Sequence, residues 1–397
     1  MYHRLRVGLL VVFCLSIGNL FGLFAQHSTD YYSLSMVGNA GNGIFAPYYL
    51  SANKHGLVTH SKSGYLRASV FKGLEMNKRF SYEFGIDLVG LMSSTSPVSY
   101  YSDGNLKTYN PGVSSFLIQQ AYIGMKYRMI FISAGCRELT DEVVNFELSS
   151  GGLVWSGNAR PIPQVRAGFI DFVDIPFTKG WVQIKGELAY GKFMDNDFLR
   201  DHYNYYNQYI TTDALYHHKS ISFRSNPDNP FVVTIGAELA AQFGGTKRYY
   251  EKGILIDSLT MKSPTRLKDF FKILFPSSGD GQTNEGDQAY YYGNHVGQWN
   301  LSAEYRFKDN SSVRGYFEWY FDDASGMGKF NGWDGLWGLE YKSGKKNWLS
   351  NVVLEYLDMT NQSGPLNWSP SDYNDPKLDI EATGADDYYN NYFYNGW

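Results

Sequence analysis

The chain of 397 residues carries a formal charge of −4 and is rich in glycine (41), tyrosine (33) and phenylalanine (26). This mild acidity, without any basic run, argues against nucleic-acid binding. A mean hydropathy of −0.35 excludes a bundle of transmembrane helices. A membrane β-barrel is compatible with that value, because only every second strand residue faces lipid. A secreted β-sandwich that binds carbohydrate through its aromatic residues remains the alternative.

The N-terminus has the form of an export signal. Arg4 and Arg6 precede an apolar stretch over residues 7–24, and Ala25 fits the last residue before cleavage. We therefore predict a signal peptide over residues 1–25 and one outer-membrane domain over residues 26–397. After cleavage Cys136 would be the single cysteine of the chain, so we expect no intrachain disulfide.

The first clear hairpin lies within residues 64–91. Between residues 80 and 88 the even positions are aromatic or aliphatic, whereas Ser81, Glu83 and Asp87 lie on the opposite face. Alternation over about ten residues matches a tilted strand that crosses a bilayer. The same pattern predicts hairpins at 120–136, 301–321 and 337–356 and strands at 182–190 and 231–242.

A glutamate recurs at the centre of short alternating segments, on the face that carries small or polar residues. These glutamates are Glu187, Glu238, Glu304, Glu318, Glu340 and Glu355. A soluble sheet would bury its apolar face, whereas a membrane barrel turns that face to lipid and its charges to the lumen. Lys185, Arg306 and Arg314 share the inward faces. We therefore predict that ion pairs connect neighbouring strands on the lumenal face of the wall. Each pair contributes about 0–1 kcal/mol where water reaches it.

The predicted connections are unequal in length. Short turns fall near 76–79, 128–129, 308–312 and 343–347, and long segments at 92–114, 138–180, 192–214, 243–298 and 322–334. Short periplasmic turns and long external loops are typical of outer-membrane barrels. We predict an all-β fold, an antiparallel transmembrane outer-membrane β-barrel of about a dozen or more strands.

Two segments depart from the alternating pattern. Leu267, Phe270 and Leu274 fall at helical spacing, which predicts a short amphipathic helix over residues 266–275. It would either plug the mouth of the barrel or cap its own loop. Residues 357–397 lack alternation, so we expect that closing strands are missing and that the sheet is open, with residues 65–74 and 352–357 as its edges.

Two stretches resemble a known family. Residues 45–57 (FAPYYLSANKHGL) are similar to the N-terminal motif of the capsule assembly Wzi family of Bacteroidetes-type bacteria. Residues 152–166 (GLVWSGNARPIPQVR) resemble the most distinctive motif of that family. The resemblance covers residues 30–397. It implies a monomeric outer-membrane barrel that helps attach or organise capsular or extracellular polysaccharide, and family members are longer at the C-terminus.

The second motif admits two interpretations. Trp155, Arg160 and Arg166 offer an aromatic platform and guanidinium groups for an acidic sugar. Alternatively, the two prolines form a rigid turn at the barrel rim and the arginines pair with lumenal acids, which is the interpretation we favour. Exposed tyrosines in a long loop would stack on sugar rings or form an interfacial girdle. These tyrosines are Tyr203, Tyr205, Tyr206 and Tyr209.

The chain carries no catalytic signature that we can assign to named residues. His217 and His218 are adjacent, so in a strand they point to opposite faces and cannot bind one metal together. We expect a non-enzymatic protein without cofactor or metal, in contact with polysaccharide and outer-membrane lipid. The rival hypothesis is a substrate-specific, porin-like channel.

Overall fold

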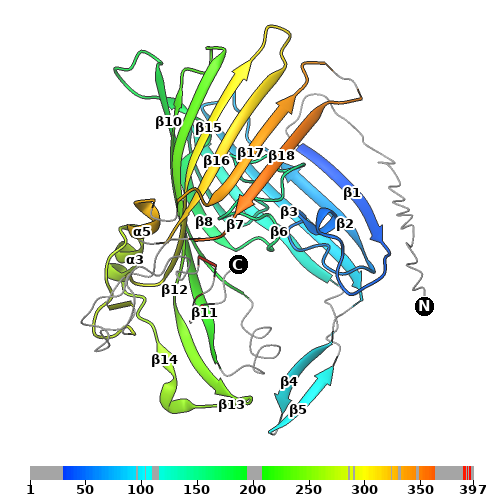
Figure 1. Cartoon of the computed structure of the whole chain (residues 1–397), viewed down its shortest axis with the longest axis vertical. Helices are drawn as coiled ribbons and strands as arrows, with labels where there is room; N and C mark the ends of the chain where they lie inside the picture. The colour runs from blue at the N-terminus through cyan, green and yellow to red at the C-terminus, as the bar shows by residue number, and fades with distance from the viewer. Residues whose placement is uncertain are drawn as a thin grey trace, which may run out of the picture.

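The computed structural model describes residues 30–94, 97–102, 104–109, 116–194, 208–284, 287–288, 291–322, 324–329, 332–345, 348–362, 388–389, 391 and 393–394. Within these ranges the chain forms one 16-stranded antiparallel sheet that curls into a barrel wall, and a separate two-stranded sheet (Figure 1). The predicted signal peptide lies outside the described residues.

Neighbouring strands follow one another along the chain around the wall. In order they are β1 (Asp30–Asn39), β2 (Ser63–Lys72), β3 (Phe80–Ser93), β6 (Phe116–Tyr127), β7 (Ile130–Cys136), β8 (Gln164–Phe169), β10 (Val182–Lys192), β11 (Gln208–Ser225), β12 (Phe231–Glu251), β15 (Asn294–Arg306), β16 (Ser312–Phe321), β17 (Gly335–Lys342) and β18 (Asn351–Asp358). Short strands extend it: β9 (Val173–Asp174) pairs with β10, and β13 (Ile254–Leu255) and β14 (Met261–Lys262) pair with β12. The separate sheet pairs β4 (Val98–Ser102) with β5 (Asn105–Tyr109).

The helical elements in the described ranges are short. They are α1 (Tyr48–Ser51), η1 (Asp257–Leu259), α3 (Leu267–Leu274) and α5 (Ala324–Met327). No helix among the described residues has the length and apolar character needed to cross a bilayer.

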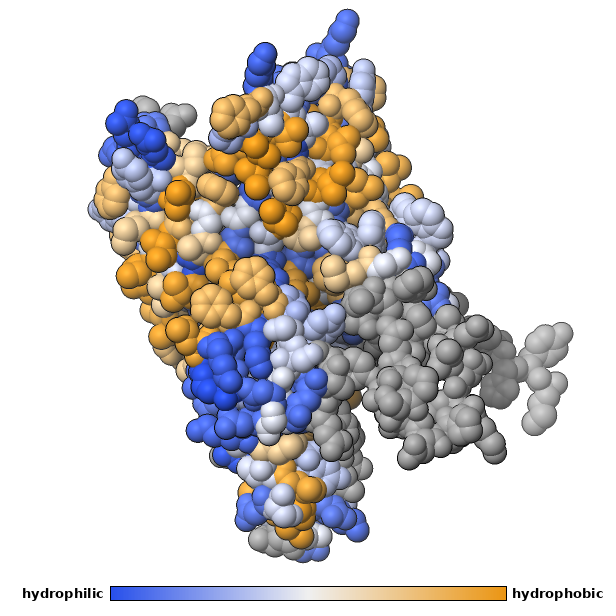
Figure 2. Space-filling model, turned by 90° about the vertical axis from the view of Figure 1, so that its left-hand side faces the viewer, coloured by the Kyte–Doolittle hydropathy of each residue, from blue (hydrophilic) through white to orange (hydrophobic). Residues whose placement is uncertain are grey.

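The two faces of the wall differ as the alternation predicts. In β3, Phe80 and Tyr82 are more than half exposed, whereas Ser81, Glu83 and Asp87 are buried on the inner face. Figure 2 shows hydrophobic residues gathered over the strands on one side of the barrel, with hydrophilic residues gathered below them. Apolar side chains outside and buried charges inside characterise a membrane β-barrel. The structure thus confirms the predicted all-β barrel and its location in the outer membrane.

The connections alternate between the two ends of the wall, because consecutive strands are antiparallel neighbours. At one end they are 73–79, 128–129, 170–181, 226–230, 307–311 and 343–350. The β4–β5 hairpin, β13 and β14 lie at the other end, at the bottom of Figure 1. Since short turns face the periplasm in such barrels, the lower end in this view is extracellular.

Two predicted long loops contain strands of the wall. β8 lies inside the predicted loop 138–180, and its six residues are too few to show alternation. β11 begins inside the predicted loop 192–214. Asp213 has a positive φ of 59° there, and the pairing skips it, from Thr212↔Thr246 to Ala214↔Gly244. Gly245, which lies opposite it on β12, also has a positive φ, so the pairing is interrupted on both strands without a change of register, and the strand signal is broken at this point.

Of the two predicted edges of the sheet, one is correct and the other is wrong. β18 lies at one end of the strand order, as expected for residues 352–357, and no pairing joins it to β1 within the described ranges. Residues 65–74 are not an edge, because β1 pairs with β2 from Asp30↔Lys72 to Asn39↔Ser63.

The interior of the barrel is occupied by residues 137–163, which connect β7 to β8 and are called the inner segment below. Its apolar side chains pack against inward residues of the wall and against Tyr388 and Tyr394 from near the end of the chain. The inner-segment residues of this buried cluster are Val144, Leu153, Val154 and Ile162, and the wall contributes Tyr216, Tyr316, Tyr320 and Leu336 among others. The barrel therefore contains a packed apolar core as well as charges.

The predicted amphipathic helix exists as α3. Of the two predicted positions, the plug of the mouth is wrong, whereas the helix does pack against its own loop, where Arg266, Lys268 and Lys272 pair with Asp280. It lies against the outer face of the wall, where Tyr190 Oη donates to the carbonyl of Phe270 at 3.0 Å. Lys219 Nζ donates to the carbonyl of Ile273 at 3.0 Å. Tyr190 and Lys219 alternate with the inward residues of β10 and β11, so the helix packs on the side that faces away from the lumen.

Candidate functional site

Inward polar side chains of β15 and β16 bind the backbone of the inner segment. Glu318 Oε2 accepts a hydrogen bond from the backbone N–H of Leu153 at 2.9 Å. Gln298 Oε1 accepts one from the N–H of Val154 at 3.0 Å. All four residues are buried. A buried loop without strand partners needs such acceptors, since an unpaired buried N–H costs about 1–3 kcal/mol.

The glutamates of β17 and β18 hold the preceding part of the inner segment. Glu340 Oε1 accepts from Asn145 Nδ2 at 2.6 Å. Glu355 accepts from Ser149 Oγ at 2.6 Å and from the backbone N–H of Ser150 at 2.8 Å. The recurrent glutamates therefore serve the inner segment as much as they serve neighbouring strands.

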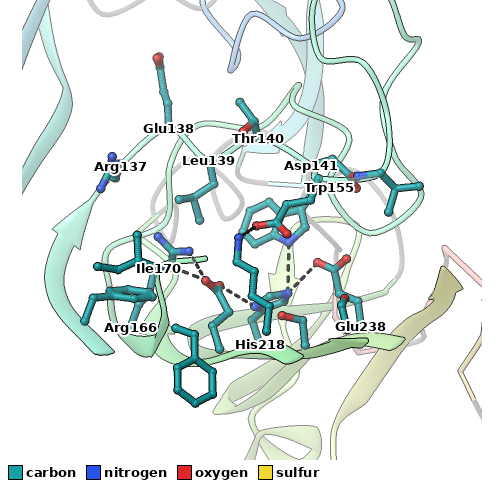
Figure 3. Close-up of a pocket in the computed structure, with 18 of the residues that line it drawn as sticks. Arg137, Glu138, Leu139, Thr140, Asp141, Trp155, Arg166, Ile170, His218 and Glu238 are labelled. Atoms are coloured by element: carbon teal, nitrogen blue, oxygen red, sulfur yellow. Dashed lines mark hydrogen bonds and ion pairs between the residues drawn. The ribbon is translucent and has the colours of Figure 1, made fainter. Parts of the chain in front are cut away.

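A second cluster, centred on His218 of β11, joins four strands to the inner segment (Figure 3). His218 Nε2 lies 2.7 Å from Glu238 Oε1, and His218 Nδ1 lies 3.3 Å from Glu187 Oε1 at an ion-pair distance. Arg166 Nη2 pairs with Glu187 Oε2 at 2.5 Å. The indole Nε1 of Trp155 lies 3.3 Å from His218 Nε2, with the two rings edge to face. An imidazole thus sits between two carboxylates under an aromatic ring.

This cluster lines a cavity of about 410 Å³. Leu74, Met76 and Ile170, which belong to two short connections, also line it, so the cavity lies at the periplasmic end of the barrel. Lys185 pairs there with Glu142 of the inner segment. The remaining charged residues of the lining are Glu83, Arg137, Glu138 and Asp141.

Asp141 is the carboxyl group of the cavity that lacks a cation in the described structure. Its Oδ1 accepts from the backbone N–H groups of Val143 at 2.6 Å and Val144 at 3.2 Å. Its Oδ2 is buried and has no hydrogen-bond partner among the described residues. Burial, together with the nearby charge of Glu238, raises the pKa of Asp141 to about 7.

Other predicted lumenal charges are distributed differently. Glu304 lies opposite Arg314 in register, but Arg314 pairs with Glu340 at 2.6 Å. Arg306 lies outside the network, because it stands at the end of β15 and its Nη2 donates to the carbonyl of Pro227 at 2.7 Å.

The predicted polysaccharide-binding residues are only partly brought together. Trp155 and Arg166 meet at the cavity, with the guanidinium of Arg166 held by Glu187. Arg160 is exposed and donates from Nη2 to the carbonyl of Ile118 at 3.0 Å. Tyr203, Tyr205 and Tyr206 lie outside the described residues, and the nearby Tyr209 packs on Tyr249 with ring centroids 5.1 Å apart.

Several charged groups of the interior escaped the sequence analysis. Arg67 bridges Asp87 and Glu138, and Arg137 binds both oxygens of Glu83 at 3.0 Å. The inward position of Glu83 and Asp87 was readable from alternation, but their partners lie on a neighbouring strand and in the inner segment. His218 was considered only as a metal ligand. Among the described residues no group of three or more His, Cys, Asp or Glu side chains is placed to hold a metal ion.

The two stretches that resemble the Wzi family touch each other in the interior. The backbone N–H of Asn53 donates to Asn158 Oδ1 at 2.9 Å. The N–H of His55 donates to the carbonyl of Gly157 at 2.8 Å. Gly157 has a φ of 69°, and a Cβ there would lie 2.7 Å from Asn53 Oδ1, so the contact requires glycine.

No protein-family model and no curated protein matches the chain. Among solved structures, a variant of the Rhodopseudomonas blastica porin aligns at 10% identity and a TM-score of 0.28, over 81% of this chain and 98% of the porin. Wzi of Escherichia coli aligns at 10% identity and a TM-score of 0.29, over 83% of this chain and 80% of that protein. Wzi is described as an outer-membrane protein involved in group 1 capsule assembly and a carbohydrate-binding β-barrel. At these scores the likeness identifies neither family nor ligand.

Proposed function

We propose that this outer-membrane barrel is a non-enzymatic protein that retains or assembles capsular or extracellular polysaccharide at the cell surface. The observation that carries the proposal is the contact between residues 45–57 and 152–166. These stretches resemble the capsule assembly Wzi family, and they meet through hydrogen bonds between segments about a hundred positions apart. Neither stretch pairs as a strand at this contact. The contact therefore does not serve to build the barrel wall.

The filled interior supports retention over transport. The inner segment is bound by Gln298, Glu318, Glu340 and Glu355, which lie on four successive strands. Its apolar side chains pack into a buried cluster on the extracellular side of the cavity. A general porin instead keeps a water-filled channel through its lumen.

The cavity beside Trp155 is closed toward the cell surface by this buried apolar cluster, so it is the candidate contact for a sugar unit that reaches the barrel from the periplasm. Its volume of about 410 Å³ falls in the range of about 300–1,000 Å³ of small-molecule sites. Carboxylates such as Glu238 accept hydrogen bonds from hydroxyl groups, and an aromatic ring packs on a sugar face. Since Arg166 is engaged by Glu187, we propose a hydroxyl-rich sugar unit rather than an acidic one for this cavity.

A gene deletion with complementation tests the proposal. We expect the deletion strain to release polysaccharide into the medium and the intact gene to restore cell association. Trp155→Ala should fail to restore it, whereas the control Trp348→Ala should succeed, because Trp348 is 94% exposed in a short periplasmic connection. Heat-modifiable migration on gels would verify that both variants fold. Normal retention of polysaccharide in the deletion strain would contradict the proposal.

The rival function is a substrate-specific channel, and the charged cavity at the periplasmic end is the observation that favours it. Planar-bilayer recording separates the two. A filled barrel should give no steady conductance, whereas a channel should conduct and be blocked by its substrate sugar. Steady conductance with sugar-dependent block would replace the retention proposal by the channel.

A further inference from the structure

The outer face of the wall carries a polar patch where a lipid-facing sheet should be apolar. His217 lies opposite Ala241 on β12, and Ala241 lies opposite His295 on β15, so both histidines point outward at one level of the barrel. Lys219 points outward one pleat further along β11. All three polar groups lie under or beside α3 rather than in contact with bulk lipid. The two histidines are buried.

The helix satisfies the lysine of this patch with its own backbone, whereas His217 bonds the carbonyl of Ala189 and His295 bonds that of Tyr292. Lys219 Nζ donates to the carbonyls of Ile273 and Leu274, in the last turn of α3, where a cation also complements the helix dipole. Phe270 and Ile273 pack against Tyr190 and Phe243 of the wall. One face of α3 is therefore fully used in covering the barrel.

A second apolar stripe on α3 has no cover. Leu267 is 77% exposed, Phe271 55% and Phe275, the residue directly after the helix, 70%. They are spaced by four residues, so they lie along one side of the helix. Large aromatic and aliphatic side chains in such a row mark a surface that contacts an apolar phase.

The position of this stripe identifies that phase. On β12, the outward residues Phe231 and Ile235 are more than half exposed, and the lipid-facing band runs from them toward Leu239. The polar patch at the level of Ala241 follows directly, so α3 lies where the apolar band ends on the extracellular side. Figure 2, which views the side of the barrel on which α3 lies in Figure 1, shows hydrophobic residues continuing down to a hydrophilic cluster.

The charges around the helix fit the same boundary. Lys268, Lys272 and Arg266 flank the stripe and converge on Asp280 at 2.9, 3.6 and 2.9 Å. Asp269 binds Arg266, so the cluster retains one excess positive charge. Lysine and arginine beside an apolar row are typical of helices that lie in a membrane interface.

We infer that α3 is an interfacial anchor that lies in the plane of the outer leaflet. Leu267, Phe271 and Phe275 enter the boundary of the acyl chains, and the basic cluster lies at the level of the anionic headgroups. The helix thereby extends the lipid-facing band around a patch that the strands leave polar, and it fixes the depth of β10–β12 in the bilayer. This inference does not depend on the proposed function in polysaccharide retention.

Site-directed spin labelling of the full chain in liposomes tests the inference. With Cys136, the single cysteine expected after cleavage of the signal peptide, replaced by serine, a label at Phe271→Cys should relax faster with oxygen than with a water-soluble nickel complex. A label at Ile235→Cys, on the lipid-facing strand surface, is the positive control. Leu106→Cys is the matched negative control, because Leu106 is also apolar and 52% exposed but belongs to the separate β4–β5 sheet.

We expect the accessibility ratio at position 271 to resemble that at position 235 and to differ from that at position 106 by severalfold. Heat-modifiable migration of each labelled protein would confirm that its barrel is intact. Nickel accessibility at position 271 equal to that at position 106 would overturn the inference, because the stripe would then face water.

Discussion

Two adjacent histidines on β11 show how differently the faces of the wall accommodate polar groups. His218 faces the lumen and lies between Glu187 and Glu238, so its partners are charged side chains of neighbouring strands. His217 faces outward, where Nδ1 bonds the carbonyl of Ala189 at 2.9 Å and the ring packs on Tyr190 beneath α3. The inward histidine is thus held between charged side chains, whereas the outward histidine is covered and bonded to backbone.

The largest expected effect comes from removing the lumenal partner. His218→Leu leaves Glu187 and Glu238 buried without the imidazole between them, which should cost about 3–5 kcal/mol in the free energy of unfolding. Urea unfolding in detergent measures it. The matched variant His217→Leu loses one hydrogen bond and should cost only about 0.5–1.5 kcal/mol. Equal costs for the two variants would break the contrast between the faces.

A similar difference exists within the lumen. Unlike Glu187 and Glu238, Asp141 is buried without a cationic partner among the described residues. Its pKa of about 7 lies above the usual 3.8, so the folded protein retains a proton that the unfolded chain releases. The contribution of Asp141 to stability is therefore present below about pH 4 and is lost as pH rises to about 7, at about 1.4 kcal/mol per unit of pKa shift at most.

Unfolding measured across this pH range tests the role of Asp141. Asp141→Asn keeps the acceptor for Val143 and Val144 and should flatten the decline in stability between pH 4 and pH 7. The control Asp228→Asn, at an exposed turn, should leave the decline unchanged. An undiminished decline in Asp141→Asn would show that another group titrates.

On the outer face, Lys219→Met should weaken the docking of α3 by about 1–2 kcal/mol, because the last-turn carbonyls lose their cationic donor. Hydrogen exchange of the α3 amides should accelerate while the global unfolding midpoint moves little. Lys308→Met, in an exposed turn, serves as the control. Unchanged exchange in α3 would show that apolar packing alone holds the helix.

The smallest effect is expected at the rim. Arg160 is exposed and makes one described hydrogen bond, so Arg160→Ala should cost at most about 1 kcal/mol. Arg166→Ala removes the partner of Glu187 inside the barrel and should cost more. Denaturant midpoints of both variants give the comparison. A larger loss for Arg160→Ala would place the structural role of the motif at the rim rather than in the lumen.

The sequence by itself determined the faces of the strands and the short turns. Period-two alternation is local, so residues 80–88 reveal which side chains face lipid without any knowledge of the neighbouring strands. The same holds for the turn at residues 128–129 between β6 and β7, and for the helical spacing that predicts α3. The long wall strands that escaped detection are β1 and β11, and the pairing of β11 is interrupted at Asp213 and Gly245; the very short β8 also escaped, because its local signal is brief.

Only the tertiary structure decided what the inward glutamates bind and on which side of the wall α3 lies. Glu318 binds the backbone N–H of a residue 165 positions earlier, and alternation says nothing about which loop occupies the lumen. The side of α3 depends on Tyr190 and Lys219, two outward polar groups that are isolated in sequence and become one surface when β10 and β11 pair. Partners in a barrel depend on strand order and on buried loops, both of which are long-range properties.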